Sequence, residues 1–122
     1  MLRPFQLQRF AIILFWSAAT FALVMASLQN PIALPSDPGD KFKHIIAFAV
    51  LALLGALAYP GVRLLTLLLG LSVFGALIEL IQLIPSLNRT SDWEDLAADI
   101  LAAATVLGAI FVVRRIRKPS AA

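Results

Sequence analysis

Four long hydrophobic runs, separated by short polar segments, dominate the pattern along this chain of 122 residues. The first run, residues 10–28, holds 19 residues without a charge, enough for a helix to cross a hydrocarbon layer of about 30 Å. The other three runs predict helices over residues 40–59, 62–84 and 92–113. The pattern therefore predicts an all-α fold, with one membrane domain (1–122) built as a bundle of four transmembrane helices.

Turn and capping signals mark the expected ends of these helices. Pro60 and Gly61 indicate a tight turn between the second and third runs, and Pro85 ends the third because proline cannot continue a helix. Ser91 and Glu94 have the spacing of a capping box at the start of the fourth helix. The first run exceeds the roughly 7–15 apolar residues of a signal peptide, so we expect a membrane anchor there.

Composition narrows the class of protein further. Hydrophobic residues make up 61% of the chain and charged residues 14%, and cysteine is absent. A typical soluble domain has about 45–50% hydrophobic and about 25% charged residues. A domain this small cannot bury so many additional hydrophobic side chains. These values exclude a soluble monomer, a disulfide scaffold and a Cys-ligated metal site. The basic run 114–118 is expected to anchor the chain end and meet anionic lipid, and no nucleic-acid partner is expected.

Charged residues are distributed unevenly between the two ends of such a bundle. Seven of the ten basic residues share one side with the termini: Arg3, Arg9, Arg63, Arg114, Arg115, Arg117 and Lys118. The opposite side holds Lys41, Lys43 and Arg89, and all seven acidic residues lie on or near it. By the positive-inside rule, both termini are predicted to be cytoplasmic.

Small residues are spaced four apart in the fourth run. The pairs are Ala98/Ala102 and Ala104/Gly108. Small residues at this spacing let membrane helices approach closely, so we expect the fourth helix to pack through these two pairs.

Glu79 is the most unusual residue of the third run, because it interrupts an apolar segment. An ionised side chain at the centre of a membrane helix costs about 2.5–3.5 kcal/mol, and less toward the end. Glu79 precedes Ile84, the expected end of the helix, by about 7–8 Å. It therefore requires a partner, a proton or a water-filled cleft, and Gln82, three residues on, shares its face.

The other helices offer matching polar groups at the same end. Asp92, Asp95 and Asp99 form one stripe on the fourth helix, and Asp40 and His44 are one turn apart on the second. We expect these groups to converge on a pocket that opens outward at headgroup depth. The candidate ligand-binding residues are Asp40, Lys41, His44, Glu79, Gln82, Arg89, Asp92, Asp95 and Asp99.

These residues also carry a family resemblance. In chain order the residues that carry it are Asp40-Lys41-Phe42-Lys43-His44, Phe48, Glu79-Leu80-Ile81-Gln82, Pro85, Arg89, Asp92 and Asp95. Their order and spacing, ahead of a helix rich in small residues, resemble the VanZ-like family over residues 40–108. The family tends to have Asn at the position of Asp99 and Gly at those of Ala102 and Ala103.

The resemblance implies a multi-pass protein of the bacterial inner (cytoplasmic) membrane. It also implies a link to resistance against lipid-bearing glycopeptide antibiotics such as teicoplanin, with which the founding member is associated. It supplies neither an established mechanism nor a known cofactor.

Three functions fit the polar residues. In the first, the outer site binds the polar head of an amphiphile such as a membrane lipid, a lipid-linked envelope precursor or a lipoglycopeptide. In the second, a membrane-embedded enzyme acts on an envelope lipid, with Glu79 and His44 as acid and base, or with a divalent cation held by His44, Glu79, Asp95 and Asp99. In the third, buried ion pairs only fix the packing of the helices. The sequence contains no nucleophile elbow, Gly-rich phosphate loop or HExxH motif, which favours binding over catalysis.

Overall fold

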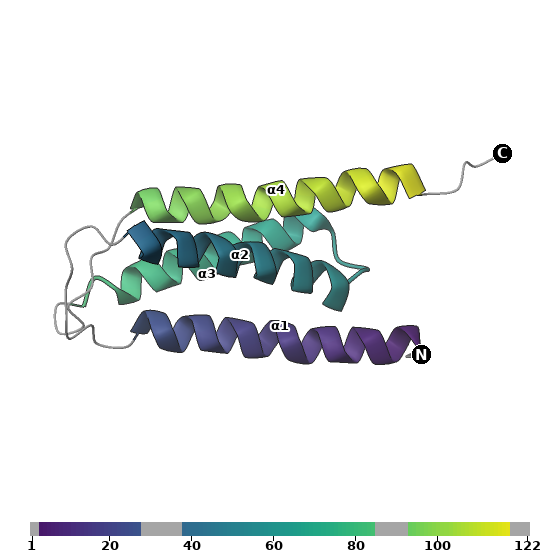
Figure 1. Ribbon diagram of the computed structural model, residues 1–122, viewed down its shortest axis with the longest axis horizontal. Helices are drawn as coiled ribbons and strands as arrows, with labels where there is room; N and C mark the ends of the chain where they lie inside the picture. The colour runs from purple at the N-terminus through teal and green to yellow at the C-terminus, as the bar shows by residue number, and fades with distance from the viewer. Residues whose placement is uncertain (1–2, 28–37, 85–92, 118–122) are drawn as a thin grey trace.

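In the computed structural model, the described residues form four helices that follow one another in an up-and-down order (Figure 1). The helices are α1 (Pro4–Ser27), α2 (Pro38–Ala58), α3 (Leu64–Ile81) and α4 (Trp93–Arg117). The structure describes residues 3–27, 38–84 and 93–117, with the side chains of α2 described from Phe42 onward. These residues contain no strand, so the predicted all-α class is confirmed for the described chain.

Three of the four helices, α1, α3 and α4, are long and apolar enough to cross a membrane. In α2 the apolar part is shorter and covers Phe42–Ala58. Length and composition alone therefore define a multi-pass membrane protein with three clear spans, and α2 is a helix packed among them.

The helix α1 begins at Pro4, earlier than the predicted residue 10. Proline is favoured in the first position of a helix because the amide that it lacks would have no intrahelical partner. The backbone N–H of Arg3 donates a hydrogen bond of 2.9 Å to the Gln6 side-chain oxygen, which is the reciprocal half of a capping box. This local cap extends the helix into the polar segment before the first hydrophobic run.

The helix α3 ends at Ile81, earlier than the predicted residue 84. The chain then tightens, because Leu83 and Ile84 donate their amides to the carbonyls three residues back, at 3.2 and 3.1 Å. Glu79 consequently lies in the last turn of α3, closer to the helix end than the sequence predicted.

The helix α4 runs to Arg117, beyond the predicted residue 113. Its last turn contains Arg114, Arg115 and Arg117, and cations are favourable near the negative end of a helix dipole. The basic segment after the fourth hydrophobic run is therefore helical as far as Arg117.

The helix α2 packs against α4, α1 and α3, while α1 and α4 lie on opposite sides of the bundle (Figure 1). The N- and C-termini lie at the same end of the bundle, together with the turn between α2 and α3. In that turn the Val62 amide donates a 3.0 Å hydrogen bond to the Tyr59 carbonyl, as the Pro60-Gly61 signal predicts. The other end holds the starts of α2 and α4 and the end of α3.

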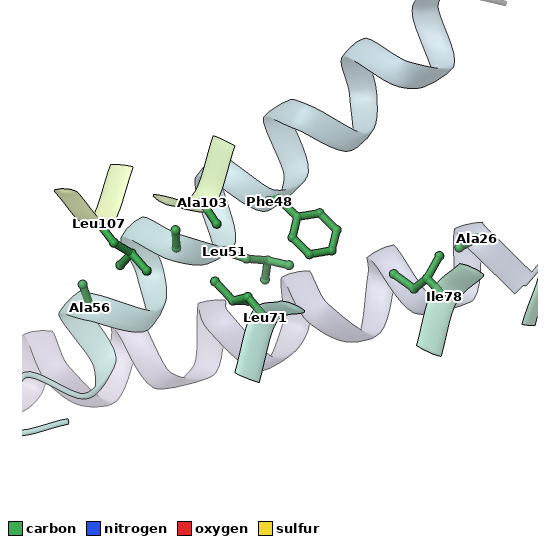
Figure 2. Close-up of a cluster of buried hydrophobic side chains, with 9 residues drawn as sticks. Ala26, Phe48, Leu51, Ala56, Leu71, Ile78, Ala103 and Leu107 are labelled. Carbon is green, nitrogen blue, oxygen red and sulfur yellow. The ribbon is translucent and has the colours of Figure 1, made fainter. Parts of the chain in front are cut away.

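One apolar cluster joins all four helices (Figure 2). Within it, Ala26 of α1 lies beside Ile78 of α3, and Leu51 of α2 lies near Leu71 of α3. Three alanines at the helix contacts, Ala52, Ala56 and Ala103, are almost fully buried. Small side chains allow helix backbones to approach closely, which is how membrane helices gain packing energy.

The predicted small-residue contact through Ala104 and Gly108 is wrong. Gly108 is exposed, and a Cβ atom built on it would meet nothing within 4 Å. Ala103, one position earlier, is the buried residue instead. The buried stripe of α4 runs instead through Asp99, Ala103 and Leu107, also spaced four apart, and only tertiary packing selects which stripe of this alanine-rich helix is buried.

Candidate functional site

Three polar side chains are buried among the described residues, and all three lie toward one end of the bundle. They are Glu79 (1% exposed), Gln82 (5%) and Asp99 (2%). Glu79 and Gln82 are one turn apart, so they occupy the same inward face where α3 ends. Glu79 therefore points into the protein, away from the lipid-facing side chains of α3.

His44 and Asp99 bring α2 and α4 together at the same level. Each is the seventh residue of its helix, and the two helices run in the same direction (Figure 1). Both helices begin at the same end of the bundle, so each of these residues lies about 9 Å along its helix axis from the helix start. The Nδ1 atom of His44 lies 3.8 Å from Oδ2 of Asp99, a distance at which they form an ion pair when His44 is protonated.

The two oxygens of Asp99 have different surroundings. Oδ2 faces His44, whereas Oδ1 is buried and accepts no hydrogen bond from the part of the chain that the structure describes. The carboxylates of Asp95 and Glu79 lie within electrostatic reach of Asp99. Asp99 is thus a buried acceptor that faces two like charges and one histidine.

An apolar layer lies directly below these polar residues. Phe48 is one turn deeper than His44 on α2, and Gly75 is one turn deeper than Glu79 on α3. A Cβ atom on Gly75 would lie 2.9 Å from Cδ1 of Leu96 and 3.3 Å from Cζ of Phe48. The close approach at Gly75 therefore lets Phe48 form the apolar floor of a polar layer made by His44, Glu79, Gln82, Asp95 and Asp99. Leu96, three residues before Asp99 on α4, packs against Gly75 from the side of that layer.

The structure describes five of the nine candidate ligand-binding residues with their side chains: His44, Glu79, Gln82, Asp95 and Asp99. For Asp40 and Lys41 it describes the backbone in α2 only, and Arg89 and Asp92 lie outside the described residues. The predicted capping box at Ser91 also lies outside them. The described members of the predicted set come from three helices and lie at the same end of the bundle.

The described histidine, aspartate and glutamate side chains form no group of three or more that could hold a metal ion. The divalent-cation site considered at His44, Glu79, Asp95 and Asp99 therefore has no such group of ligands among the described residues. This layer offers carboxylate oxygens as acceptors, the Gln82 amide, which both donates and accepts, and one imidazole.

The opposite end of the bundle holds polar contacts that sequence reasoning missed. Arg114 donates from Nη2 to the Ala56 carbonyl at 3.1 Å, and Gln8 donates from Nε2 to the Ala58 carbonyl at 3.1 Å. These bonds satisfy carbonyls that the end of α2 leaves without intrahelical partners. The signal available in the sequence was the polar character of Gln8 and Arg114, which does not say where their partners lie.

The fold and the polar layer define a multi-pass helical membrane protein with a buried acceptor site near one end of its bundle. No family model, no curated protein and no solved structure matches this chain. The resemblance to the VanZ-like family stays a prediction from the sequence.

Proposed function

We propose that the polar layer binds the polar head of an amphiphilic envelope ligand: a lipid, a lipid-linked precursor or a lipoglycopeptide. The observation that carries the proposal is Oδ1 of Asp99, which is buried without a hydrogen-bond donor among the described residues. Leaving such an acceptor unsatisfied costs about 1–3 kcal/mol, and more when it is charged. A hydroxyl or amine of a ligand would supply the missing donor.

The depth and walls of the site favour an amphiphile over a water-soluble ligand. Asp99 lies about 9 Å along α4 from its start, which is near the junction of headgroups and acyl chains. The Phe48 floor below it is apolar, and the lipid-facing surfaces of the helices beside it are apolar too. A ligand with a polar head and an apolar tail would place its head in the polar layer and its tail beside the apolar residues below it.

The proposed orientation places this site on the outer face of a bacterial inner membrane. Six basic residues of the described chain lie at the end that holds the termini and the α2–α3 turn: Arg3, Arg9, Arg63, Arg114, Arg115 and Arg117. The positive-inside rule makes that end cytoplasmic, which supports four crossings with α2 included. The VanZ-like resemblance of the residues at the other end supports an envelope ligand and a part in glycopeptide resistance.

Orientation is tested by cysteine labelling, which is simple because the chain has no cysteine. Ser36→Cys, between α1 and α2, and Ser120→Cys, after α4, are each expressed in cells and treated with a membrane-impermeant maleimide. We expect Ser36→Cys to react in intact cells and Ser120→Cys to react only after lysis. The reverse pattern would place the polar layer on the cytoplasmic face.

Binding is tested by energy transfer from tryptophan to a dansyl-labelled polyprenyl phosphate, with unlabelled teicoplanin as a competitor. The chain has two tryptophans, so Trp16→Phe leaves Trp93, at the start of α4, as the reporter of this end. Asp99→Leu is compared in that background with Glu94→Leu. Both changes remove one carboxylate from the first two turns of α4, but Glu94 is exposed and Asp99 is buried.

We expect Asp99→Leu to weaken binding by about tenfold or more, since a hydrogen bond to a charged group contributes about 1.5–3 kcal/mol. Glu94→Leu should change the affinity by less than about twofold, the range of ordinary surface substitutions. Glu79→Gln should weaken binding in the same direction as Asp99→Leu. Equal affinities for Asp99→Leu and Glu94→Leu, or no binding of either probe to the parent protein, would refute the proposed site.

The His44–Asp99 pair supports a second candidate, a membrane-embedded acid–base enzyme acting on an envelope lipid. A carboxylate beside Nδ1 orients an imidazole so that its other nitrogen can exchange a proton with a substrate. In this case the purified protein would convert a polyprenyl diphosphate or a similar lipid, and His44→Gln would abolish turnover while leaving binding intact. Binding without turnover in the unmodified protein would exclude this candidate for the lipids tested.

A further inference from the structure

A groove of about 310 Å³ lies between α2 and α4, at the end of the bundle that carries both termini. The apolar side chains along it include Leu53, Leu57, Ile110 and Val113. The groove also has Arg114 and Arg117 among its lining residues. It is separate from the polar layer, which lies at the opposite end of the same two helices.

The two arginines lie where α4 extends beyond α2. Because His44 and Asp99 are level, Ala58 at the end of α2 is level with Val113, and Arg117 lies about 6 Å further along α4. Arg114 is held over the groove by its bond to the Ala56 carbonyl. No hydrogen bond or ion pair ties Arg117 to another described residue.

Among the described residues, no side-chain carboxylate lies at the end of the bundle where this groove carries its positive charge. All acidic residues fall at positions 37, 40, 79, 92, 94, 95 and 99, and those described belong to the other end of the bundle. An arginine guanidinium has five N–H donors, and Arg114 uses one of them on the Ala56 carbonyl. The groove therefore combines apolar walls with unneutralised donors at its outer end.

We propose that this groove binds an anionic phospholipid from the surrounding leaflet. One acyl chain lies along the walls formed by Leu53, Leu57 and Val113, and the phosphate accepts charge-assisted hydrogen bonds from Arg117 and the remaining donors of Arg114. A lipid of this class matches both the order of the lining residues and the sign of their charge. The proposal does not depend on the ligand of the polar layer.

The test is native mass spectrometry of the full chain in detergent, titrated separately with dioleoyl phosphatidylglycerol and dioleoyl phosphatidylcholine. Arg117→Gln is compared with Arg115→Gln, which removes the same charge from the same turn of α4. Arg115 does not line the groove, since its guanidinium carbon lies 5.9 Å from the centre of the Phe111 ring. The walls are tested by Ala109→Phe, which fills the groove, against Gly108→Phe, because Gly108 is the neighbouring residue and does not line the groove.

We expect the unmodified chain to bind phosphatidylglycerol more tightly than phosphatidylcholine, and Arg117→Gln to weaken phosphatidylglycerol binding about fivefold, the usual effect of one basic residue. Arg115→Gln and Gly108→Phe should change it by less than about twofold. Ala109→Phe should weaken the binding of both lipids. Equal affinities for the two lipids, or equal losses for Arg115→Gln and Arg117→Gln, would overturn the groove as the site and leave only general attraction to the basic end.

Discussion

His44 and Asp99 are each the seventh residue of a helix, and Nδ1 of His44 lies 3.8 Å from Oδ2 of Asp99. This distance exceeds that of a good hydrogen bond, and the second oxygen of Asp99 has no donor among the described residues. A pair built for stability would satisfy both oxygens, because a buried charge gains net stability only with good geometry and additional hydrogen bonds. The His44–Asp99 contact is therefore a weak source of stability, which is consistent with the proposed role of Asp99 in binding a ligand.

The substitution Asp99→Leu should leave the free energy of unfolding unchanged or raise it by up to about 1 kcal/mol. Leucine removes the unsatisfied oxygen and its electrostatic repulsion from Asp95 and Glu79, and it has a similar shape. The measurement is reversible unfolding in detergent micelles with increasing dodecyl sulfate. A loss of more than about 2 kcal/mol would favour the alternative in which Asp99 only fixes the helices by ion pairing.

The substitution Gly75→Val should destabilise the bundle by about 1–3 kcal/mol, the usual result of overpacking. The added carbons would meet Leu96 and Phe48, whose atoms already lie 2.9 and 3.3 Å from a Cβ position. Gly70→Val is the matched control, since it lies in the same helix and has open space around it. The measurement is the same unfolding titration, and similar losses at Gly70 and Gly75 would show that backbone propensity, not packing, is responsible.

The substitution Arg114→Gln should destabilise the bundle by about 1.5 kcal/mol, because it removes a charged donor from the Ala56 carbonyl. The cation also lies at the negative end of the α2 dipole, so its charge adds to the bond. Arg115→Gln serves as the control of equal charge and should cost less than about 0.5 kcal/mol. Equal unfolding midpoints for Arg114→Gln and Arg115→Gln would contradict a specific role of Arg114 in capping α2.

Trp16 and Tyr59 should show a coupling energy of about 0.6 kcal/mol in a double-mutant cycle. Nε1 of Trp16 donates a hydrogen bond of 2.7 Å to the Tyr59 hydroxyl, which joins α1 to the residue that follows α2. Phe15 packs edge-on against both rings, at 5.2 and 6.1 Å between ring centres, and is unchanged in the cycle. The cycle compares Trp16→Phe, Tyr59→Phe and the double variant by unfolding, and additive losses would mean that the bond contributes nothing.

Much of this architecture follows from the sequence alone, because the local signals are strong. In the hydrocarbon layer, the backbone N–H and C=O groups of a run of 19 uncharged residues find their hydrogen-bond partners by forming a helix. The Pro60-Gly61 pair indicates a turn. The spacing of Glu79 and Gln82 placed both on one face, and both are buried. Helix ends were less accurate, since the Gln6 cap and the arginines after residue 113 extend helices into segments that hydropathy marks as polar.

The sequence by itself determined that the chain is helical, that it belongs in a membrane and that its acidic and basic residues separate toward opposite ends, because these properties depend on each segment alone. Tertiary structure decided which side chains meet. The 3.8 Å approach of His44 to Asp99, the burial of Ala103 in place of Gly108, and the reach of Arg114 to the Ala56 carbonyl depend on the rotation and register of one helix against another. A helix of alanine and leucine offers several nearly equivalent stripes to its neighbour, so only the packing of all four helices together selects one.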